Sequence, residues 1–528
     1  MLKQAMRYYH TLKYLQWTQI KYRLLYQIKK NHSLPTVSQA EYLGKVSTEN
    51  FHFQESIASP SSWLGDGAFR FLNISNRFDN EIDWNYSEQG KLWTYNLNYF
   101  EFLSQPNISK IEGLGLIHDF IGKEDKSKDG MEPFPISLRI IFWIKFLFKF
   151  RINDVQIQRS LFRQLRRLSA MPEYHLMGNH LLENGFGLLF GGIYFQDKKI
   201  LQQARAILKE QLEEQILEDG AHFELSPMYH QIMLFRILDC INLLKNSKPT
   251  AGKDLLELLK EKATLMLGWM KEMTFENGDM PLLNDSANGI APTAAELFQY
   301  AQRLELSIEK IDLSDSGYRK FSNSNYEVIV DVGNIGPDYI PGHAHSDTFN
   351  FILYHKGKPL IVDTGISTYE KNERRTIERS TASHNTVMVE GKEQSEVWGG
   401  FRVARRAKVK ILTESNNRIE ATHDGYKKLG VWHRRVFEFR ENEIDILDDV
   451  GNKKFGTAIF HFHPDVDVVI EKGKISGEDW SIEFDDSEEI EKLKSQKYLF
   501  ATGFNKTREA LKVEIPFFML LKTTIILS

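Results

Sequence analysis

The most informative stretch of the sequence runs from Gly342 to Thr386. It contains three polar segments, His343-Ala344-His345-Ser346-Asp347, Ile361-Val362-Asp363-Thr364-Gly365 and Ser383-His384-Asn385-Thr386. The apolar run Pro359-Leu360-Ile361-Val362 predicts a buried β-strand with Asp363 at its end. This stretch therefore indicates a β domain that gathers side chains of the kinds that bind metals and move protons.

His345, Asp363 and His384 are of the residue types that ligate metals. Two imidazoles and one carboxylate suit Zn²⁺, with a water molecule completing the tetrahedron. His343 lies two residues before His345, so on a strand both would share one face and His343 would be free for proton transfer. The alternative is a set of unrelated histidines in a β domain, and spacing alone leaves both interpretations open.

The sequence around this stretch has the texture of strands. Alternating apolar and polar residues, with Gly, Asn and Asp turns between them, occur at 326–332, 386–390, 436–440 and 443–450. These patterns predict an antiparallel β-sandwich after a boundary near residues 310–322.

The sequence before this boundary has a helical pattern. Apolar residues recur at helical spacing in segments near 137–150, 154–170, 178–194, 197–217, 228–245, 252–274 and 293–305. Helices of similar length joined by short turns form either a solenoid or a closed ring. No repeat of 34 or 40 residues is visible, which weighs against a regular solenoid. The predicted fold class is therefore multidomain, α then β.

The first 32 residues are basic and aromatic, with no acidic residue before Glu41. They predict one amphipathic helix that packs on the next domain, and association with a membrane surface is the alternative. We find no transmembrane segment and no signal-peptide pattern, so the sequence favours a cytoplasmic location. The cell envelope or periplasm is the alternative.

The composition limits the classes of partner. The 528 residues are 42% hydrophobic and 26% charged, as in a soluble globular protein of two or three domains. A formal net charge of −4 gives no general attraction to polyanions, so nucleic acid is not an expected partner. The single cysteine, Cys240, allows no internal disulfide. The oligomeric state stays open, and a homo-oligomer is compatible with the sequence.

Two polar clusters lie in the helical half. Asn179, His180 and Glu183 fall within one turn at the start of a helix, where they could also serve as cap and first-turn residues. Glu224 and Tyr229 belong to a polar loop that leads into another helix, where a tyrosine can donate a proton but more often only packs.

A basic and aromatic ribbon follows in the second half. Its members are Arg374, Arg375, Arg379, Lys392, Trp398, Phe401, Arg402, Arg405, Arg406 and Lys408. Guanidinium groups match carboxylates and sulfates, and aromatic rings stack on sugars. An ordinary solvated strand face would explain the ribbon equally well.

Four motifs in this order resemble the heparinase II/III family of polysaccharide lyases. They are Asn179-His180-x-x-Glu183, Glu224-x-Ser226-x-x-Tyr229, Gly342-His343-Ala344-His345-x-Asp347 and Ser383-His384-Asn385-Thr386-Val387. The stretch from Trp93 to Tyr99 is similar to the family's heparin-sulfate-lyase-type amino-terminal domain. The resemblance covers about residues 50 to 528.

The resemblance implies an incomplete (α/α) toroid at 46–315 and an antiparallel β-sandwich at 320–528, after a basic helix and linker at 1–45. It places the active site between the two domains and a structural Zn²⁺ on His345, Asp363 and His384. We expect substrate-binding residues in both domains: Tyr95, Asn96, Asn98, Arg379, Trp398, Arg402 and Arg405.

The resemblance also implies catalytic roles in β-elimination from a uronic-acid-containing acidic polysaccharide. Asn179 would neutralise the uronate carboxylate, with His180 beside it, because the C5 proton is weakly acidic while that group is charged. Tyr229 would protonate the leaving oxygen. His343 would take the C5 proton of one epimer and Tyr229 that of the other. Glu183 and Glu224 would support these residues.

The sequence leaves two other functions open. A glycoside hydrolase on the same helical ring would use Glu183 with Glu224 or Asp219 as paired carboxylates. A non-catalytic glycan-binding protein of a bacterial surface-polysaccharide pathway is the other alternative. The basic amino terminus resembles family members linked to a bacterium's own surface polysaccharide, so the substrate itself is not fixed.

Overall fold

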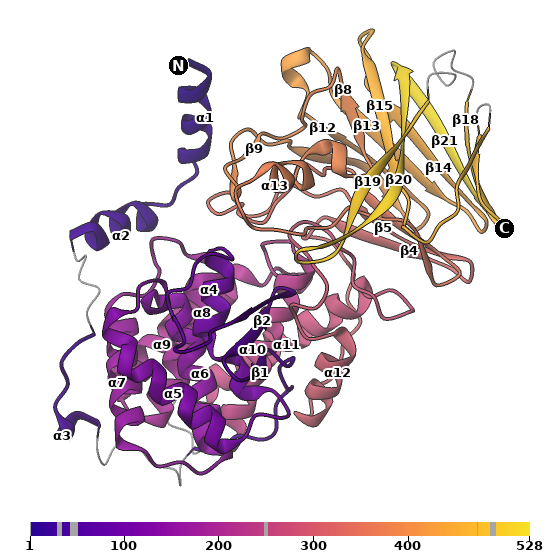
Figure 1. Ribbon diagram of the computed structural model, residues 1–528. Coiled ribbons are helices and arrows are strands. Elements are labelled where there is room, and N and C mark those ends of the chain that lie inside the picture. Colours follow the sequence, from indigo (N-terminus) through magenta and orange to yellow (C-terminus); the bar gives the residue numbers. More distant parts are fainter. Residues whose placement is uncertain (1, 29–33, 43–50, 248–251, 472–473, 486–492) are drawn as a thin grey trace.

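The computed structural model describes residues 2–28, 34–42, 51–247, 252–471, 474–485 and 493–528, and shows a helical domain joined to a β domain (Figure 1). The predicted boundary at residues 45–46 lies outside the described residues. No helix among the described segments is long and apolar enough to cross a membrane.

The helical half contains a group of amino-terminal elements and a ring of helices. The amino-terminal elements are α1 (Leu2–Leu12), α2 (Trp17–Ile28), α3 (Gln39–Tyr42), β1 (Trp63–Gly65), β2 (Ala68–Phe71) and β3 (Ile74–Arg77). The helices that follow are α4 (Lys91–Tyr99), α5 (Lys110–Lys123), α6 (Pro133–Lys149), α7 (Val155–Ala170), α8 (Gly178–Tyr194), α9 (Lys198–Gln215), α10 (Pro227–Asn246), α11 (Lys253–Met273) and α12 (Ala294–Arg303).

The helix ends follow from local chemistry. Asp154 caps α7 by accepting a hydrogen bond from Gln156 N at 2.9 Å, and Ser226 caps α10 by accepting one from Tyr229 N at 3.3 Å. In the packed centre, Gly187 of α8 lies so close to Ser137 of α6 that an added Cβ would stand 2.8 Å from the Ser137 Cα. The predicted helix at 178–194 is confirmed residue for residue.

The predicted single amino-terminal helix is wrong, because two helices form. Leu15 N donates to Leu12 O, and Gln16 N donates to the side chain of Gln19, so the chain turns between α1 and α2. The two helices then dock on different domains: Arg7 of α1 pairs with Glu396 at 2.7 Å, whereas Gln19 of α2 donates to Leu176 O at 3.1 Å. The helical spacing of apolar residues reflects only the local preference for helix, so it does not show that the segment divides into α1 and α2.

Within its described residues, the β domain contains three principal antiparallel sheets and one short hairpin. The first sheet is β4 (Tyr318–Ser322), β5 (Tyr326–Asp331), β6 (Phe351–His355) and β7 (Lys358–Ile361) in sequence order. The second sheet has the order β19 (Lys494–Gly503), β20 (Lys506–Phe518), β15 (Phe455–His461) and β8 (Val387–Val389).

The third sheet has eight strands. Its order is β11 (Val409–Ser415), β12 (Arg418–His423), β13 (His433–Phe439), β14 (Glu443–Asp449), β21 (Leu520–Leu527), β18 (Trp480–Phe484), β17 (Lys474–Ser476) and β16 (Val469–Glu471). The hairpin pairs β9 (Val397–Trp398) with β10 (Arg402–Val403), and helix α13 (Glu373–Glu378) precedes β8.

The first sheet joins the two domains. Trp269 and Met273 of α11 share a buried apolar cluster with Tyr318, Ile329 and Ile352 of the sheet. In Figure 1 this sheet lies on the side of the β domain that faces the helices. An apolar seam of this kind fixes one domain against the other, and so positions side chains from both at their junction.

Candidate active site

Helix α8 presents Asn179 from an unusual start. Met177 and Gly178 both have positive φ, 65° and 58°, so the chain turns sharply into the helix. Asn179 N then donates to Glu224 Oε1 at 3.1 Å, and Asn179 Nδ2 donates to Glu224 Oε2 at 2.8 Å. Both side chains are buried. Glu224 thus fixes the amide with its Nδ2 group directed toward the domain junction, where it lies 3.5 Å from His343 Nε2.

Tyr229 of α10 and His343 of the β domain stack on each other. Their ring centroids are 3.9 Å apart with an interplanar angle of 31°. The Tyr229 hydroxyl lies 3.4 Å from the Tyr369 hydroxyl. Burial raises the pKa of Tyr229, so its hydroxyl keeps its proton at neutral pH. A protonated phenol in this position can donate a proton.

Asp285 organises the junction, although the sequence analysis did not single it out. Its Oδ2 lies 2.9 Å from His343 Nδ1, and its Oδ1 lies 2.9 Å from His345 Nε2. Arg375 forms a bidentate ion pair with the same carboxylate. Burial would raise the pKa of Asp285, but the charge of Arg375 and the histidine hydrogen bonds hold it well below its usual range.

The ionised Asp285 selects the state of His343. Because a carboxylate only accepts hydrogen bonds, His343 Nδ1 must donate to it. In the neutral imidazole, Nε2 is then the proton acceptor, and it faces Asn179 Nδ2. A histidine held by a carboxylate in this way is suited to act as a general base.

Hydrogen bonds of the loop that contains Asn284 and Asp285 keep Asp285 in place. Asp285 N donates to His343 O at 3.1 Å, and Asp285 O accepts a hydrogen bond from Ser226 Oγ at 2.8 Å. Asn284, with a positive φ of 53°, accepts at its Oδ1 from His345 N at 3.0 Å. The loop therefore joins the start of α10 to the loop that carries both histidines.

His343 and His345 lie in a loop between β5 and β6, so the expectation that they share a strand is wrong. Their side chains nevertheless converge, because each reaches a different oxygen of Asp285. The carboxylate of Asp285, from the other side of the domain junction, thus brings the two imidazoles together without a shared strand face.

His180 of α8 belongs to a second network, which is centred on buried Glu173 in the loop before this helix. Its Nδ1 lies 3.2 Å from Glu173 Oε1, and Asn184 Nδ2 donates to Glu173 Oε2 at 3.1 Å. Burial would lower the pKa of His180, but the negative charge of Glu173 outweighs it and raises the pKa. His180 also packs against Phe134 at 4.6 Å between ring centroids.

Glu183 lies apart from these contacts. It forms a buried ion pair with Arg236 of α10, with Arg236 Nε 3.1 Å from Glu183 Oε1. Glu224 is occupied by Asn179, and Asp219 accepts hydrogen bonds from Ser314 N and Ser316 N. These carboxylates therefore do not form the opposed acid–base pair that a glycoside hydrolase needs.

The candidate zinc ligands are buried and close to one another. His384 Nδ1 lies 2.7 Å from Asp363 Oδ2, and the His345 and His384 ring centroids are 5.3 Å apart. Asp363 lies two residues after the end of β7, close to the strand end where the apolar run predicted it. Among the described residues, no group of three or more His, Cys, Asp or Glu side chains is arranged to hold a metal ion.

The donor chemistry of these residues nevertheless fits zinc. Three buried atoms of this cluster have no hydrogen-bond partner in the described parts of the chain: His345 Nδ1, His384 Nε2 and Asp347 Oδ2. Burial lowers the pKa of His345 to about 4, so its imidazole is neutral, the form that binds metal. Unpaired imidazole nitrogens beside carboxylates are the donors that a zinc ion requires.

The substrate-binding residues predicted in the helical domain each form hydrogen bonds with different partners. Tyr95 OH donates to Glu132. Asn96 Nδ2 donates to Leu92 O at 2.8 Å, within its own helix. Asn98 is buried and donates to Trp84 O and Thr94 O, so it does not face the junction.

The predicted substrate residues of the β domain are also engaged. Buried Arg379 donates to Ala344 O and Gly400 O, which braces the histidine loop. Arg402 stacks on Trp398 at 4.8 Å, and Arg405 pairs with Glu396 at 3.2 Å. Of these four residues, Arg402 is exposed.

The structure adds three residues to the site that the sequence analysis did not select: Asp285, Tyr369 and Arg375. Arg375 was included only as one member of the basic ribbon. The run Asn284-Asp285-Ser286, placed in a loop after Pro281, was a polar signal that could have indicated Asp285. No local pattern marked Tyr369.

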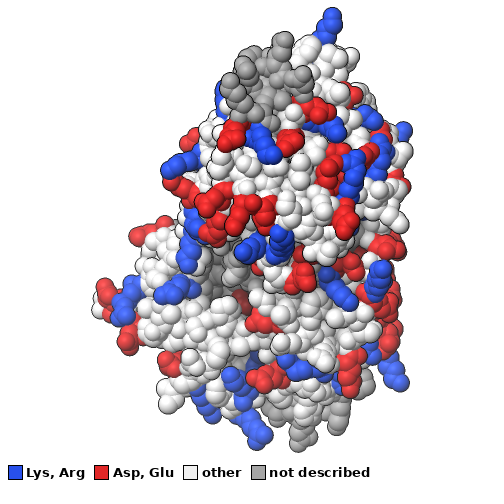
Figure 2. Space-filling view, turned by 90° about the vertical axis from the view of Figure 1, so that its right-hand side faces the viewer, with Lys and Arg blue, Asp and Glu red and all other residues white. Residues whose placement is uncertain are grey.

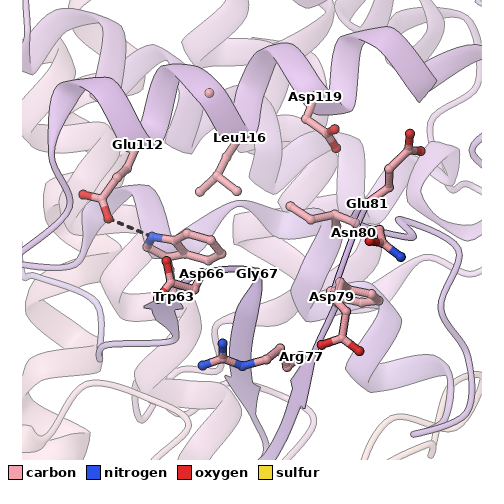
Figure 3. A pocket seen from close by; sticks show the side chains of 13 residues that line it. Trp63, Asp66, Gly67, Arg77, Asp79, Asn80, Glu81, Glu112, Leu116 and Asp119 are labelled. Carbon is pink, nitrogen blue, oxygen red and sulfur yellow. Dashed lines mark hydrogen bonds between the residues drawn. The ribbon is translucent and has the colours of Figure 1, made fainter.

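A separate pocket of about 520 Å³ lies on α5 and the small β1–β3 sheet (Figure 3). Its walls carry five carboxylates and one arginine: Asp66, Asp79, Glu81, Glu112, Asp119 and Arg77. An acidic wall repels an acidic ligand, so this pocket does not compete with the domain junction as a site for an acidic polysaccharide.

The fold and site define the class of protein to which this chain belongs, a helical toroid followed by an antiparallel β-sandwich with its polar site at the junction. A solved structure of heparinase III has the same fold, with a TM-score of 0.67 and 17% identity over 96% of this chain and 88% of that one. The heparan sulfate lyase HepC from Pedobacter heparinus, solved as a mutant, gives a TM-score of 0.59 and 15% identity over 87% of this chain and 81% of that one.

The chain belongs to the heparinase II/III family. Residues 142–306 match the heparinase II/III N-terminus, and residues 308–524 match the heparinase II/III-like C-terminal domain. The heparin-sulfate lyase of Bacteroides stercoris is 24% identical over 331 residues, which are 55% of this chain and 46% of the relative. That of Bacteroides thetaiotaomicron is 22% identical over 327 residues, 53% of this chain and 45% of the relative. The chain therefore spans less than half the length of these curated relatives.

Proposed function

We propose that the protein is a polysaccharide lyase that cleaves a uronic-acid-containing acidic polysaccharide by β-elimination. The observation that carries this proposal is the stacking of Tyr229 on His343 at 3.9 Å, beside the Asn179 amide. These three side chains come from both domains, which is the arrangement expected for a sugar bound at the junction. The relatives named heparin-sulfate lyase favour a glycosaminoglycan-like substrate.

His343 acts as the base. Its Nε2 accepts the proton from C5 while Asp285 holds Nδ1, and the negative charge of Asp285 stabilises the imidazolium that forms. The C5–H electron pair becomes the C4=C5 double bond, and the C4–O bond breaks. The product is a 4,5-unsaturated uronate.

Tyr229 acts as the acid. Because burial keeps the phenol protonated, it can give its proton to the glycosidic oxygen as that oxygen leaves C4. The same raised pKa favours His343 over Tyr229 as the base. For a substrate epimer with its C5 proton on the other face, Tyr229 would take both roles, at the cost of deprotonating a high-pKa group.

Asn179 stabilises the developing enolate. Its Nδ2 group, oriented by Glu224, donates a hydrogen bond to the uronate carboxylate. This hydrogen bond partly neutralises the carboxylate, so the negative charge that develops when C5 loses its proton is stabilised. Glu173 raises the pKa of His180 and so favours the positively charged form of this imidazole beside Asn179. Preorganised donors of this kind reduce the energy of the transition state without having to reorient.

Zinc forms the second part of the proposal. His345, Asp363 and His384 would hold the ion, and the unpartnered His345 Nδ1 and His384 Nε2 support this assignment. A bound Zn²⁺ would supply a fixed crosslink between the histidine loop and the segment after β7. It would have a structural role, since proton transfer is already provided for by His343 and Tyr229.

Ultraviolet absorbance of the unsaturated uronate tests the reaction. We would incubate the zinc-replete protein with a panel of uronic-acid polysaccharides and run Tyr229→Phe in parallel. A rise in absorbance that the variant lacks establishes β-elimination and names the substrate class. We expect Tyr229→Phe to lose at least about a hundredfold in kcat while binding the glycan normally.

The same assay separates the alternatives. Release of reducing ends without absorbance would identify hydrolysis and sink the lyase assignment. Binding of a glycan with neither signal would identify the non-catalytic glycan-binding function.

A further inference from the structure

The first two helices form a surface that neither domain covers. We call α1 and α2 together the N-terminal helix pair. In Figure 1 they lie along one side of the molecule, α1 beside the β domain and α2 beside the helical domain. Each helix uses one face for docking, and the opposite face is turned to solvent.

The docking face of the pair is polar and aromatic. On α2, Gln19 donates to Leu176 O, and Tyr22 stacks on Tyr174 with ring centroids 4.6 Å apart. On α1, Tyr8 packs edge-on against Trp398 at 5.3 Å, and Thr11 accepts from Trp398 Nε1 at 3.2 Å. The orientation of both helices is therefore fixed by contacts with the folded domains.

The solvent face of α2 is an apolar stripe. Its members recur at helical spacing: Trp17, Ile20, Leu24 and Ile28, with Lys21 among them. Trp17 is 75% exposed, Leu24 58% and Ile28 84%. The solvent face of α1 continues this character, since Tyr9 is 60% exposed and Leu12 51%. Single exposed apolar residues are ordinary, whereas a stripe of them marks a binding surface.

The surroundings of the stripe are positive. Residues 2–28 contain five Lys or Arg and no Asp or Glu. The neighbouring β domain adds Arg402, which lies near enough to Arg23 to lower its pKa together with burial. Near α1, burial and the charges of Arg405, Lys13 and Lys428 lower the pKa of His10. The apolar stripe thus lies beside basic residues of the helix pair and of the β domain. The nearby carboxylates are engaged: Glu396 pairs with Arg7 and Arg405, and Glu214 of α9 accepts from Gln16.

These two properties identify the chemistry of the partner. A helix with Trp and Leu on one side and Lys and Arg around them is suited to lie in the headgroup region of an anionic bilayer. A second copy of the chain fits less well, because a twofold interface would bring two basic patches together. We propose that the N-terminal helix pair binds the surface of a membrane containing anionic lipids, with the α2 stripe inserted at the level of the headgroups.

Vesicle sedimentation tests this proposal without reference to catalysis. The full 528-residue chain is mixed with vesicles of phosphatidylcholine alone or of phosphatidylcholine with phosphatidylglycerol. We expect the protein to sediment with the anionic vesicles and to be released by salt. Leu24→Glu should weaken binding by on the order of tenfold or more, and Lys21→Glu by at least about fivefold.

Ile111→Glu provides the matched control. Ile111 is 83% exposed on α5, outside the helix pair, so this change places the same charge on another exposed apolar site. It should leave vesicle binding unchanged, and circular dichroism should show all three variants folded. Equal loss of binding in Ile111→Glu would overturn the proposal.

Two further outcomes would also overturn it. The protein could stay in the supernatant with anionic vesicles at low salt. It could also dimerise with rising concentration, lose dimerisation in Leu24→Glu and ignore vesicles, which would assign the stripe to a second copy of the chain.

Discussion

Asp285 connects more of the candidate site than any other single side chain. One carboxylate contacts two imidazoles and one guanidinium, and all of these groups are buried except the His343 imidazole, which is partly exposed. Replacement by Asn would leave the Arg375 charge unpaired and would allow an amide N–H to face His343 Nδ1. The imidazole would then present the wrong nitrogen to the substrate.

We therefore expect Asp285→Asn to lower kcat by at least about a hundredfold and the free energy of unfolding by about 3 kcal/mol. Kinetics over a pH series and urea unfolding measure the two effects. The pH–rate profile should move as well, because His343 loses its negative partner. Asp79→Asn, a change at an exposed carboxylate, is the control and should alter neither quantity. Normal turnover in Asp285→Asn would contradict the role given to His343.

The residue-scale prediction for zinc concerns His384. After exposure to zinc and removal of excess metal, we expect the protein to retain about one ion per chain and His384→Ala to retain none. Elemental analysis measures the content directly. A chelator should lower the melting temperature of the protein but not of the variant. His463→Ala, at a half-buried histidine outside the proposed ligands, should keep its zinc. Absence of metal from the wild-type protein would remove zinc from the proposal.

The backbone conformation at the start of helix α8 determines where Asn179 lies. Gly178 has a φ of 58°, and a Cβ on it would stand 2.7 Å from Glu224 Oε1. The contact would displace the carboxylate that orients Asn179. The positive φ also disfavours any residue with a side chain, by roughly 1–2 kcal/mol.

We expect Gly178→Ala to reduce stability by roughly 1–2 kcal/mol and kcat/KM by at least about tenfold. Thermal unfolding and steady-state kinetics check these values. The control is Gly115→Ala in α5, where a Cβ would meet no atom within 4 Å, so it should be neutral or stabilising by up to about 1 kcal/mol. Equal effects of the two substitutions would show that helix propensity alone is responsible.

At the scale of the whole molecule, buried histidines predict sensitivity to acid. Burial lowers the pKa of His222 and His345 to about 4 and of His230 and His461 to about 3, from an ordinary value of 6.5. Below pH 6.5 the unfolded chain binds protons at these positions that the folded chain does not. Stability should therefore fall as the pH falls from 6.5 toward 4.

His180 and His384 act in the opposite direction, since neighbouring carboxylates raise their pKa. Their contribution is complete below pH 6.5 and is lost as the pH rises through their folded pKa. The histidines whose pKa burial lowers also include His423 and His433, so they outnumber these two. The histidines together therefore destabilise the fold in acid, with a slope of at most about 1.4 kcal/mol per pH unit for each. Urea unfolding between about pH 6.5 and about pH 4 measures it, and a flat or rising profile would contradict the prediction.

The charge distribution is also a property of the whole molecule. Figure 2 shows Lys and Arg interspersed with Asp and Glu over the face it presents, with no continuous basic stripe. This agrees with the small net charge of −4. Attraction to an acidic glycan must then depend on local groups at the domain junction, and attraction to a membrane on the N-terminal helix pair.

The elements that depend on local pattern could be predicted from the amino-acid sequence. Apolar spacing predicted α8 from 178 to 194, and alternation predicted β5, β13 and β14. Motif order predicted that Asn179, Tyr229 and His343 would meet, because residue types needed for one reaction occurred together in a known order. Periodicity and each single motif involve residues that are close together in the sequence, so both can be recognised without knowledge of the fold.

The remaining features depend on contacts between distant parts of the chain. Asp285 and Arg375 are separated by 90 residues, and their ion pair forms because an apolar seam between α11 and the first sheet holds the domains together. The amino-terminal segment forms two helices where one was predicted, and Arg7 and Gln19 find partners on different domains. Such contacts depend on which surfaces meet in space, and no local pattern of residues encodes that.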